Sequence, residues 1–235
     1  MKILYHHRTL GDGAEGIHIS EMVKAFRNIG HEVQVAGPVG DFQQTSISKR
    51  SFAKIKQFLP KFVFELLEIS YSFFCFIDLS RKAKVHHADF IYDRYITFNV
   101  GALWAAHFCR IPLVLEVNAP LAQERNNEPD ENLYLKGIAH AIERYICVKA
   151  DWTLVVSTPL KDYLESVGVP VDKCIVMPNG VDPVKFKLRL KSKSLLIDLG
   201  IPAEATVIGF TGILRAWHGV ELLVEAMGRL KAAGN

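Results

Sequence analysis

The sequence predicts a Rossmann-like α/β fold with three layers (α/β/α) and a mainly parallel sheet. Two observations favour this class. Short apolar segments rich in β-branched residues recur along the 235-residue chain, and segments with helical periodicity separate them. Strands that are apolar along their whole length are typical of a parallel sheet that helices cover on both faces. We therefore expect the strands and helices to alternate along the chain.

Residues 1–36 contain the first such unit. Lys2 to His6 has the pattern of a short buried strand, and Gly16 to Asn28 has helical periodicity. Gly30 stands where a glycine commonly ends a helix, and His31 to Ala36 follows as a second strand. The order strand, loop, helix, strand is typical of α/β proteins.

The alternation continues after residue 85, where the same criteria predict four more strands and three helices. The strands are Phe90–Tyr92, Leu113–Val117, Trp152–Val156 and Cys174–Met177; the helices lie near Phe98–Cys109, near Glu131–Val148 and after Pro159.

Two segments between these units depart from the pattern. Gly37 to Ser51 is polar and predicts a loop. Phe52 to Val85 predicts a long amphipathic helical stretch that holds seven of the fourteen phenylalanines and has basic residues at both ends. Its aromatic side chains either pack in the core or leave an apolar face that docks on a membrane carrying a lipid-linked acceptor. Peripheral membrane contact through residues 52–85 is therefore one expectation.

The chain changes character after Asn179-Gly180-Val181-Asp182, where it becomes basic and irregular. Beyond this point Thr206–Thr211 predicts a strand and His218–Lys231 a helix. One strand and one helix do not complete an α/β domain. We expect a Rossmann-like domain over residues 1–200 and the first βα unit of an incomplete second domain over residues 201–235.

The charge, the cysteines and the histidine pairs exclude several classes of function. The balance of 28 Lys and Arg against 25 Asp and Glu gives a net charge of +3, which is too small for a dedicated nucleic-acid surface. The four cysteines have no metal-ligand spacing, and the adjacent pairs His6-His7 and His86-His87 form no metal site because neighbours on a strand face opposite ways. The first apolar run is too short for a signal peptide. The sequence predicts a cytoplasmic protein with no metal, peripheral at most on the inner face of the membrane.

Gly11, Gly13 and Gly16 form a G-x-G-x-x-G loop between the first strand and the first helix. Such a loop brings backbone N–H groups to a phosphate at the positive end of the helix. An NAD site would also need an acidic residue where the second strand ends, but the sequence there is Val35-Ala36-Gly37-Pro38. Phosphate or sugar contact is favoured, with a plain tight turn as the alternative.

Five segments in order along the chain resemble glycosyltransferase family 4 of the GT-B fold. They are the glycine loop and first helix, D-R-Y at 93–95, P-L-V-L-E-V-N-A-P-L at 112–121, V-M-P-N-G-V-D-P-V-K-F at 176–186, and G-F-T-G-I-L-R-A-W-H-G-V-E-L-L-V-E-A at 209–226.

The resemblance implies retaining transfer of a sugar from a nucleotide-sugar donor to a sugar-containing acceptor, without a cofactor or an obligatory metal. Residues 1–200 would be the acceptor-side domain, and residues 201–235 would begin the donor-binding domain. Gly13 and Gly16 would lie beside the donor diphosphate and the acceptor. Asn179, Gly180 and Asp182 fall in the family's interdomain linker.

Several positions depart from the family pattern. Where many members have a histidine beside the donor sugar, this chain has Asn118, whose amide binds a hydroxyl but does not titrate. Glu116 shares the same strand face and either points into the cleft or pairs with a basic residue. We assign the catalytic position to Asn118 and Glu116. Arg94 at a strand end, with Glu15 and His18 near the glycine loop, would contact the acceptor.

In the second domain, Ile213 and His218 take the places of the family's diphosphate-binding arginine and lysine, and Arg215 can supply the missing charge. The family's paired glutamates would lie beyond Asn235. We therefore expect residues 1–235 to be inactive alone. A non-catalytic sugar-binding or assembly module is the alternative, and an NAD-binding protein is a third.

Overall fold

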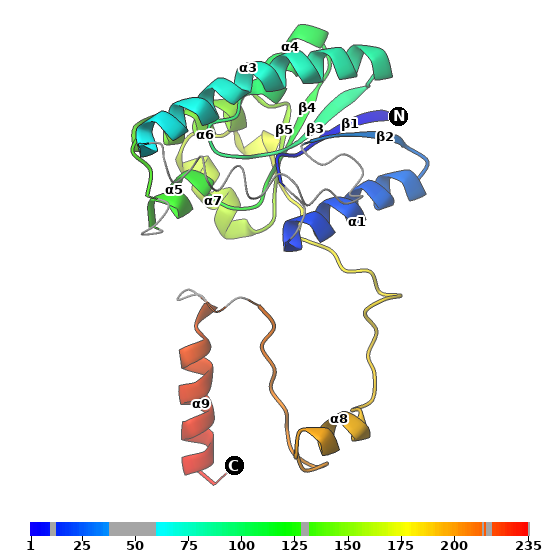
Figure 1. Ribbon diagram of the computed structural model, residues 1–235, viewed down its shortest axis with the longest axis vertical. Coiled ribbons are helices and arrows are strands. Elements are labelled where there is room, and N and C mark those ends of the chain that lie inside the picture. Colours follow the sequence, from blue (N-terminus) through cyan, green and yellow to red (C-terminus); the bar gives the residue numbers. More distant parts are fainter. Residues whose placement is uncertain (10–12, 38–59, 128–131, 213, 215–217, 235) are drawn as a thin grey trace. The chain divides into compact units, whose positions relative to one another are not determined.

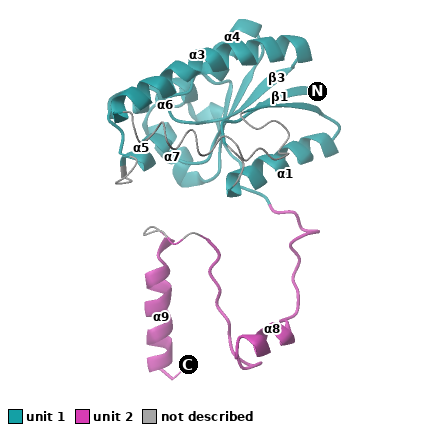
Figure 2. Cartoon of the chain, viewed as in Figure 1, with its two compact units in different colours: residues 1–180 teal, residues 181–235 magenta. Residues whose placement is uncertain are grey.

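The computed structural model describes residues 1–9, 13–37, 60–127, 132–212, 214 and 218–234. The chain forms two compact units, residues 1–180 and residues 181–235 (Figure 2). The first unit holds all the described strands. The expected division at residue 200, with a donor-binding domain beginning at 201, stays a prediction.

The first unit is built on one six-stranded parallel sheet with the order β2-β1-β3-β4-β5-β6. The chain passes from β1 to β2 in one direction and then returns to place β3 on the other side of β1. Such a reversal is where open parallel sheets bind ligands, beyond the carboxyl ends of the strands. The strands are β1 (Lys2–His6), β2 (Glu32–Ala36), β3 (Phe90–Arg94), β4 (Leu113–Val117), β5 (Trp152–Val155) and β6 (Cys174–Val176).

Helices cover both faces of this sheet, which confirms the predicted three-layer α/β class. Figure 1 shows α3 and α4 on one side and α1 on the other. The helices of the first unit are α1 (Ala14–Asn28), α3 (Lys61–His86), α4 (Gly101–Cys109), α5 (Leu121–Asn127), α6 (Lys136–Lys149) and α7 (Thr158–Ser166).

Strand alternation divides the core into two parts. Leu4, Ile91 and Leu115 point to one face, where they pack with residues of α3, α4, α6 and α7. Tyr5 and Tyr92 point to the other face and pack against α1. Neighbouring residues on one strand therefore serve opposite layers.

A close approach of backbones joins α3 to α4. Gly101, the first residue of α4, lies against the Ser72 carbonyl and the Cys75 side chain, so a β-carbon there would be only 2.6 Å from Cys75 Cβ. The Ser72 hydroxyl donates to the Phe98 carbonyl at 2.9 Å and accepts from the Val100 N–H at 3.2 Å. These contacts fix where α4 begins.

The helix predicted near residues 131–148 is α6, which begins at Lys136, and α5 precedes it without having been predicted. The start of α6 is set by a distant carboxylate. Buried Glu65 of α3 accepts the backbone N–H groups of Tyr134 and Leu135, each at 2.7 Å. These are donors that a helix start leaves without a partner of its own.

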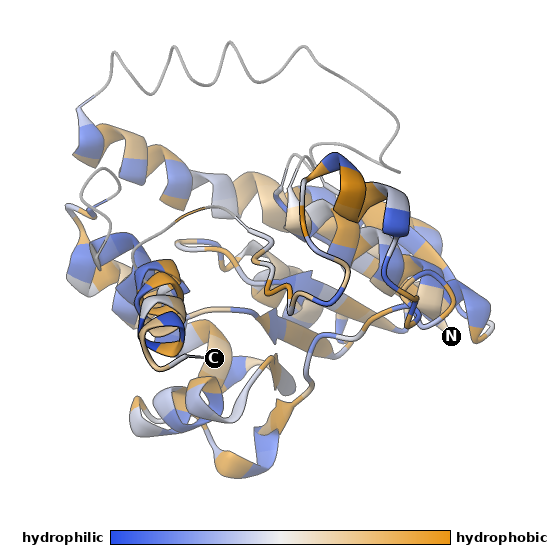
Figure 3. Ribbon diagram, turned by 90° about the horizontal axis from the view of Figure 1, so that it is seen from below, coloured by the Kyte–Doolittle hydropathy of each residue, from blue (hydrophilic) through white to orange (hydrophobic). Residues whose placement is uncertain are grey.

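The second unit contains α8 (Lys193–Asp198) and α9 (Val220–Ala232). The helix predicted at 218–231 is therefore confirmed, and Figure 3 shows hydrophilic and hydrophobic residues mixed around it. The strand predicted at Thr206–Thr211 is wrong, since these residues form no strand. A strand needs a neighbour for its backbone groups, and the described part of this unit offers none.

Replacing Gly101 by alanine should destabilise the first unit by about 1–3 kcal/mol, because the new methyl group overlaps the backbone of α3. Thermal unfolding followed by circular dichroism measures the effect. Gly137→Ala is the matched control: the space around Gly137 in α6 is open, so this variant should unfold at the wild-type temperature or above. Equal behaviour of the two variants would contradict the close-approach explanation.

Candidate functional site

A buried carboxylate lies at the carboxyl end of β4, next to the reversal of the strand order. The side chain of Glu116 is only 3% exposed and stands on the α1 face of the sheet. A charged group at this depth needs partners that replace water. Its surroundings therefore determine what the site can do.

Five donors from four segments of the chain surround this carboxylate. Oε1 accepts from His18 Nε2 at 3.0 Å, from Arg94 Nη1 at 2.8 Å and from the Asn118 side-chain amide, and Oε2 accepts from the Tyr92 hydroxyl at 2.8 Å and the Tyr5 hydroxyl at 3.5 Å. We call Glu116 and these five residues the Glu116 cluster.

Sheet register brings most of the Glu116 cluster together. Arg94 and Glu116 are direct neighbours across β3 and β4, and Tyr5 and Tyr92 are direct neighbours across β1 and β3. The two tyrosine rings stack with centroids 4.8 Å apart. The remaining donors come from the first turns of α1 and from just after β4.

The electrostatics of the cluster fix the protonation states of Glu116 and of the two tyrosines. Burial alone would raise the pKa of Glu116, but the hydrogen bonds from His18 and Asn118 and the charge of Arg94 outweigh burial and lower the pKa to about 2. Burial and the negative charge of Glu116 raise the pKa of Tyr5 and of Tyr92. The carboxylate therefore stays ionised while both phenols stay protonated.

This arrangement makes Glu116 an anchor for other side chains. Oε1 already accepts three hydrogen bonds, and a carboxylate with a pKa near 2 takes no proton at neutral pH. Of the two alternatives for Glu116, pairing with a basic residue is the one that the structure shows. Arg94 and His18 keep 19% and 21% of their side chains exposed, so both can also reach a ligand.

The glycine loop is only partly described, and Gly11 lies outside the described residues. Gly13 caps the start of α1, whereas Gly16 is already inside the helix and donates its N–H to the Gly13 carbonyl at 3.1 Å. Glu15 accepts from the Thr9 hydroxyl at 3.0 Å, and its carboxylate lies so close to Gly13 that a β-carbon there would collide with it. An incoming phosphate at Gly13 would displace this carboxylate.

Sequence reasoning missed a second buried polar group on the opposite face of the sheet. His6 Nδ1 lies 2.6 Å from Asp93 Oδ1, and the Cys75 sulfur lies 3.7 Å from His6 Nε2. Burial alone would lower the pKa of His6, but the Cys75 sulfur and the Asp93 carboxylate raise it to about 10. His6 and Asp93 are register neighbours on β1 and β3, a pairing that the sequence analysis did not predict. All three residues are buried, and we assign them to the core.

The remaining predicted residues lie at the boundary of the units or in the second unit. Asn179 and Gly180 are exposed, and Asp182 Oδ1 accepts the Val184 N–H at 2.9 Å in a local turn. His218 is exposed, with its ring centroid 5.7 Å from that of Phe210. Arg215 lies outside the described residues.

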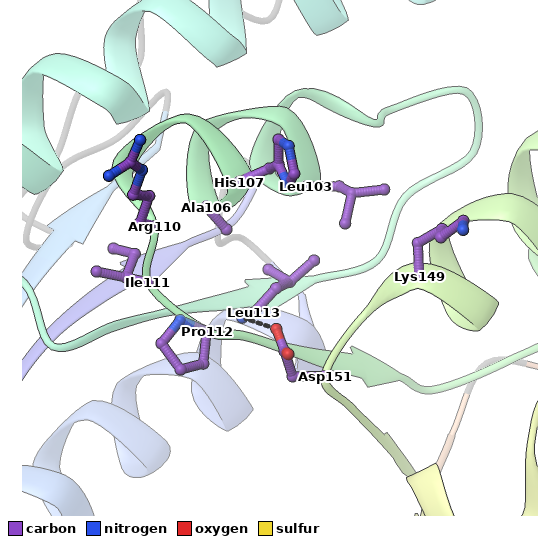
Figure 4. Close-up of a pocket in the computed structure, with 9 residues that line it drawn as sticks. All are labelled: Leu103, Ala106, His107, Arg110, Ile111, Pro112, Leu113, Lys149 and Asp151. Carbon is purple, nitrogen blue, oxygen red and sulfur yellow. Dashed lines mark hydrogen bonds between the residues drawn. The ribbon is translucent and has the colours of Figure 1, made fainter.

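A pocket of about 510 Å³ opens elsewhere in the first unit (Figure 4). It lies at the amino ends of β4 and β5, whereas the Glu116 cluster lies at the carboxyl ends. The pocket is lined by the cationic side chains of Arg110 and Lys149, by the imidazole of His107 and by the carboxylate of Asp151. Among the described residues no group of three metal-binding side chains is present.

The family model described as Glycosyltransferase Family 4 matches residues 15–185, which are more than half of the chain. The chain belongs to glycosyltransferase family 4. This result confirms the resemblance on which the sequence expectations depend. No curated protein matches the sequence significantly.

Three solved structures are similar to this chain in fold. Anabaena HepE, in complex with UDP-glucose, superposes with a TM-score of 0.59 at 19% identity, over 97% of this chain and 57% of HepE. A glycosyltransferase from Rickettsia africae gives 0.61 at 17% identity, over 98% and 57% of the two chains. UDP-GlcNAc 2-epimerase from Neisseria meningitidis gives 0.51 at 16% identity, over 76% and 46%. These likenesses show the fold, and the family 4 chain spans little more than half of the first two proteins.

Glu116→Gln should destabilise the protein by about 3 kcal/mol or more, because it leaves Arg94 without its buried partner. The loss should also depend on pH. The pKa of Glu116 in the fold, about 2, lies below its ordinary value of 4.5, so its contribution is complete above pH 4.5 and disappears as pH falls towards 2. Urea unfolding from pH 7 to pH 2 measures this difference.

Wild type and Glu116→Gln should converge in stability at the acid end of that series. Glu32→Gln is the control, since the Glu32 side chain is 62% exposed and lies 3.8 Å from Lys2. A constant gap between wild type and Glu116→Gln at every pH would rule out the buried carboxylate as its source.

Proposed function

We propose that the chain forms the acceptor-side part of a retaining glycosyltransferase. The enzyme would transfer a sugar from a nucleotide-sugar donor to a saccharide, a lipid-linked sugar or a small-molecule acceptor. Membership of family 4 supports the reaction class. The observation that carries the proposal is the Glu116 cluster, which places polar groups beyond the ends of β3 and β4 at the reversal of the sheet order.

The chemistry of this cluster suits sugar hydroxyls. The Asn118 amide donates one hydrogen to Glu116 and leaves its carbonyl oxygen for a hydroxyl donor. Arg94 has further N–H donors beyond the one that Glu116 accepts. In this proposal Asn118, Arg94 and His18 contact the acceptor, while Glu116 is a positioning residue that orients all three.

The donor side of the proposal depends on other segments. Gly13 and Gly16 at the start of α1 would lie beside the diphosphate, with Glu15 moving towards the acceptor. Residues 201–235 would begin the nucleotide-binding domain, with Arg215 and His218 on the phosphates. The structure of HepE, which shares this fold, is a complex with UDP-glucose, and this supports a nucleotide sugar as the donor class. A cytoplasmic location also stays a prediction.

The acceptor part of the proposal predicts glycan binding by residues 1–235. On a glycan array the chain should bind a defined subset of saccharides. Asn118→Ala should weaken that binding about tenfold, because each lost hydrogen bond in a polar site costs about 1 kcal/mol or more. Asn132→Ala, which changes an exposed asparagine outside the Glu116 cluster, should bind like wild type. Equal binding by all three proteins would place the sugar site elsewhere.

Turnover separates an enzyme from a binding module. Residues 1–235 should bind the acceptor without releasing nucleoside diphosphate from a panel of UDP-, GDP- and ADP-sugars, because the proposed donor domain is incomplete. Transfer or donor hydrolysis by this chain would contradict the division of labour proposed here. Enhanced NADH fluorescence on mixing would instead favour a dinucleotide-binding protein.

A further inference from the structure

The outer surface of α3 and α4 exposes large apolar side chains side by side. Phe73 and Phe74 are 58% and 66% exposed. Phe76 connects the two helices, since its ring centroid lies 6.5 Å from that of Phe73 and 5.7 Å from that of Phe108. We define the α3–α4 apolar face as Leu66, Phe73, Phe74, Ile77, Trp104 and Phe108, all of which are exposed.

The charge on this surface is positive. Arg81 and Lys84 are exposed on α3, and the ammonium of Lys84 lies 4.2 Å from the centroid of the Phe108 ring. Every carboxylate of α3 is already engaged: Glu65 accepts backbone N–H groups near α6, Glu68 pairs with Arg125 at 3.0 Å, and Asp78 pairs with Lys82 at 2.6 Å. α4 contains no acidic residue.

The pocket described above extends this positive charge along α4. Trp104 and Phe108 contact Phe76 on the α3 side of the helix, whereas His107 and Arg110 line the pocket on its other side. Figure 4 shows these two side chains projecting from α4, with Lys149 contributed by the end of α6. Asp151 lines the same pocket and accepts the Leu113 backbone N–H at 2.8 Å. The guanidinium of Arg110 and the ammonium of Lys149 are groups that suit a phosphate.

We infer that the α3–α4 apolar face docks on an anionic phospholipid membrane, with the cations of Lys84, Arg110 and Lys149 at the lipid phosphates. Aromatic and aliphatic side chains interspersed with cations match the boundary between acyl chains and headgroups. Within the described residues no helix is long and apolar enough to cross a bilayer.

This surface is separate from the Glu116 cluster, which lies on the α1 face of the sheet. The membrane contact therefore goes beyond the proposed transferase function and can be tested without a donor or an acceptor. It extends the contact predicted through residues 52–85, of which residues 52–59 lie outside the described part of the chain. The added surface is α4, with Trp104 and Phe108, and Arg110 directly after this helix.

Vesicle co-sedimentation of the full chain tests the inference. Vesicles containing phosphatidylcholine with about a third phosphatidylglycerol should bind the protein, and pure phosphatidylcholine vesicles should bind it at least tenfold more weakly. The double variant Phe73→Gln, Phe74→Gln should lose about tenfold or more in affinity for the anionic vesicles. The triple variant Lys84→Gln, Arg110→Asn, Lys149→Gln should lose about fivefold per removed charge at low salt.

Matched control variants distinguish vesicle binding through the α3–α4 apolar face from nonspecific binding through other exposed residues. Ile29→Gln with Val171→Gln removes two exposed apolar side chains elsewhere, and Lys187→Gln with Lys193→Gln removes two exposed charges in the second unit. Both control variants should bind vesicles like wild type, and circular dichroism should show all variants folded. Equal losses in control and test variants would overturn the inference, as would failure of the wild type to bind at low salt.

Self-association is the competing explanation for an exposed apolar face. Analytical ultracentrifugation of wild type should show a monomer at the concentrations used for sedimentation with vesicles. A dimer that the Phe73→Gln, Phe74→Gln variant converts to a monomer would show that a second copy covers this face, and would overturn membrane docking. Binding of an acidic peptide with no binding of anionic vesicles would overturn it in favour of a protein partner.

Discussion

The carboxylate of Glu116 is the charge around which the first unit is organised. It lies at the end of a central strand, almost fully shielded from solvent, and it receives hydrogen bonds from β1, β3, α1 and Asn118 just after β4. An ionised group at this depth is stable only while those donors stay in place. The same interaction that offsets the cost of burial therefore also fixes the geometry of the surface where the sheet order reverses.

Alternation along the strands explains why two polar groups can be buried so close together without competing. His6 and Asp93 face the α3 layer, while Tyr5 and Tyr92, their immediate neighbours in sequence, face the α1 layer. The His6–Asp93 pair is enclosed in the core, whereas the pairs of Glu116 leave Arg94 and His18 partly exposed at the carboxyl end of the sheet. Because His6 and Asp93 are buried while Arg94 and His18 are partly exposed, only the Glu116 cluster can contact a ligand.

The pocket beside α4 and the Glu116 cluster lie at opposite ends of the strands. The pocket is lined by Arg110 and Lys149 among other residues, whereas the Glu116 cluster gathers neutral and charged donors at the carboxyl ends of the strands. The first suits a phosphate at a lipid surface and the second suits sugar hydroxyls. The proposed sugar site and the proposed membrane contact therefore occupy separate surfaces of the first unit.

The sequence by itself determined the fold class, the positions of the six strands and the family, because apolar periodicity and motif spacing are local properties. It also placed Glu116, Asn118, Arg94 and His18 among the site residues. Only the tertiary structure decided that they meet in one cluster, that Glu116 is saturated by donors, and that residues 206–211 form no strand. Those outcomes depend on strand register and on neighbours far away in the chain, which no local pattern records.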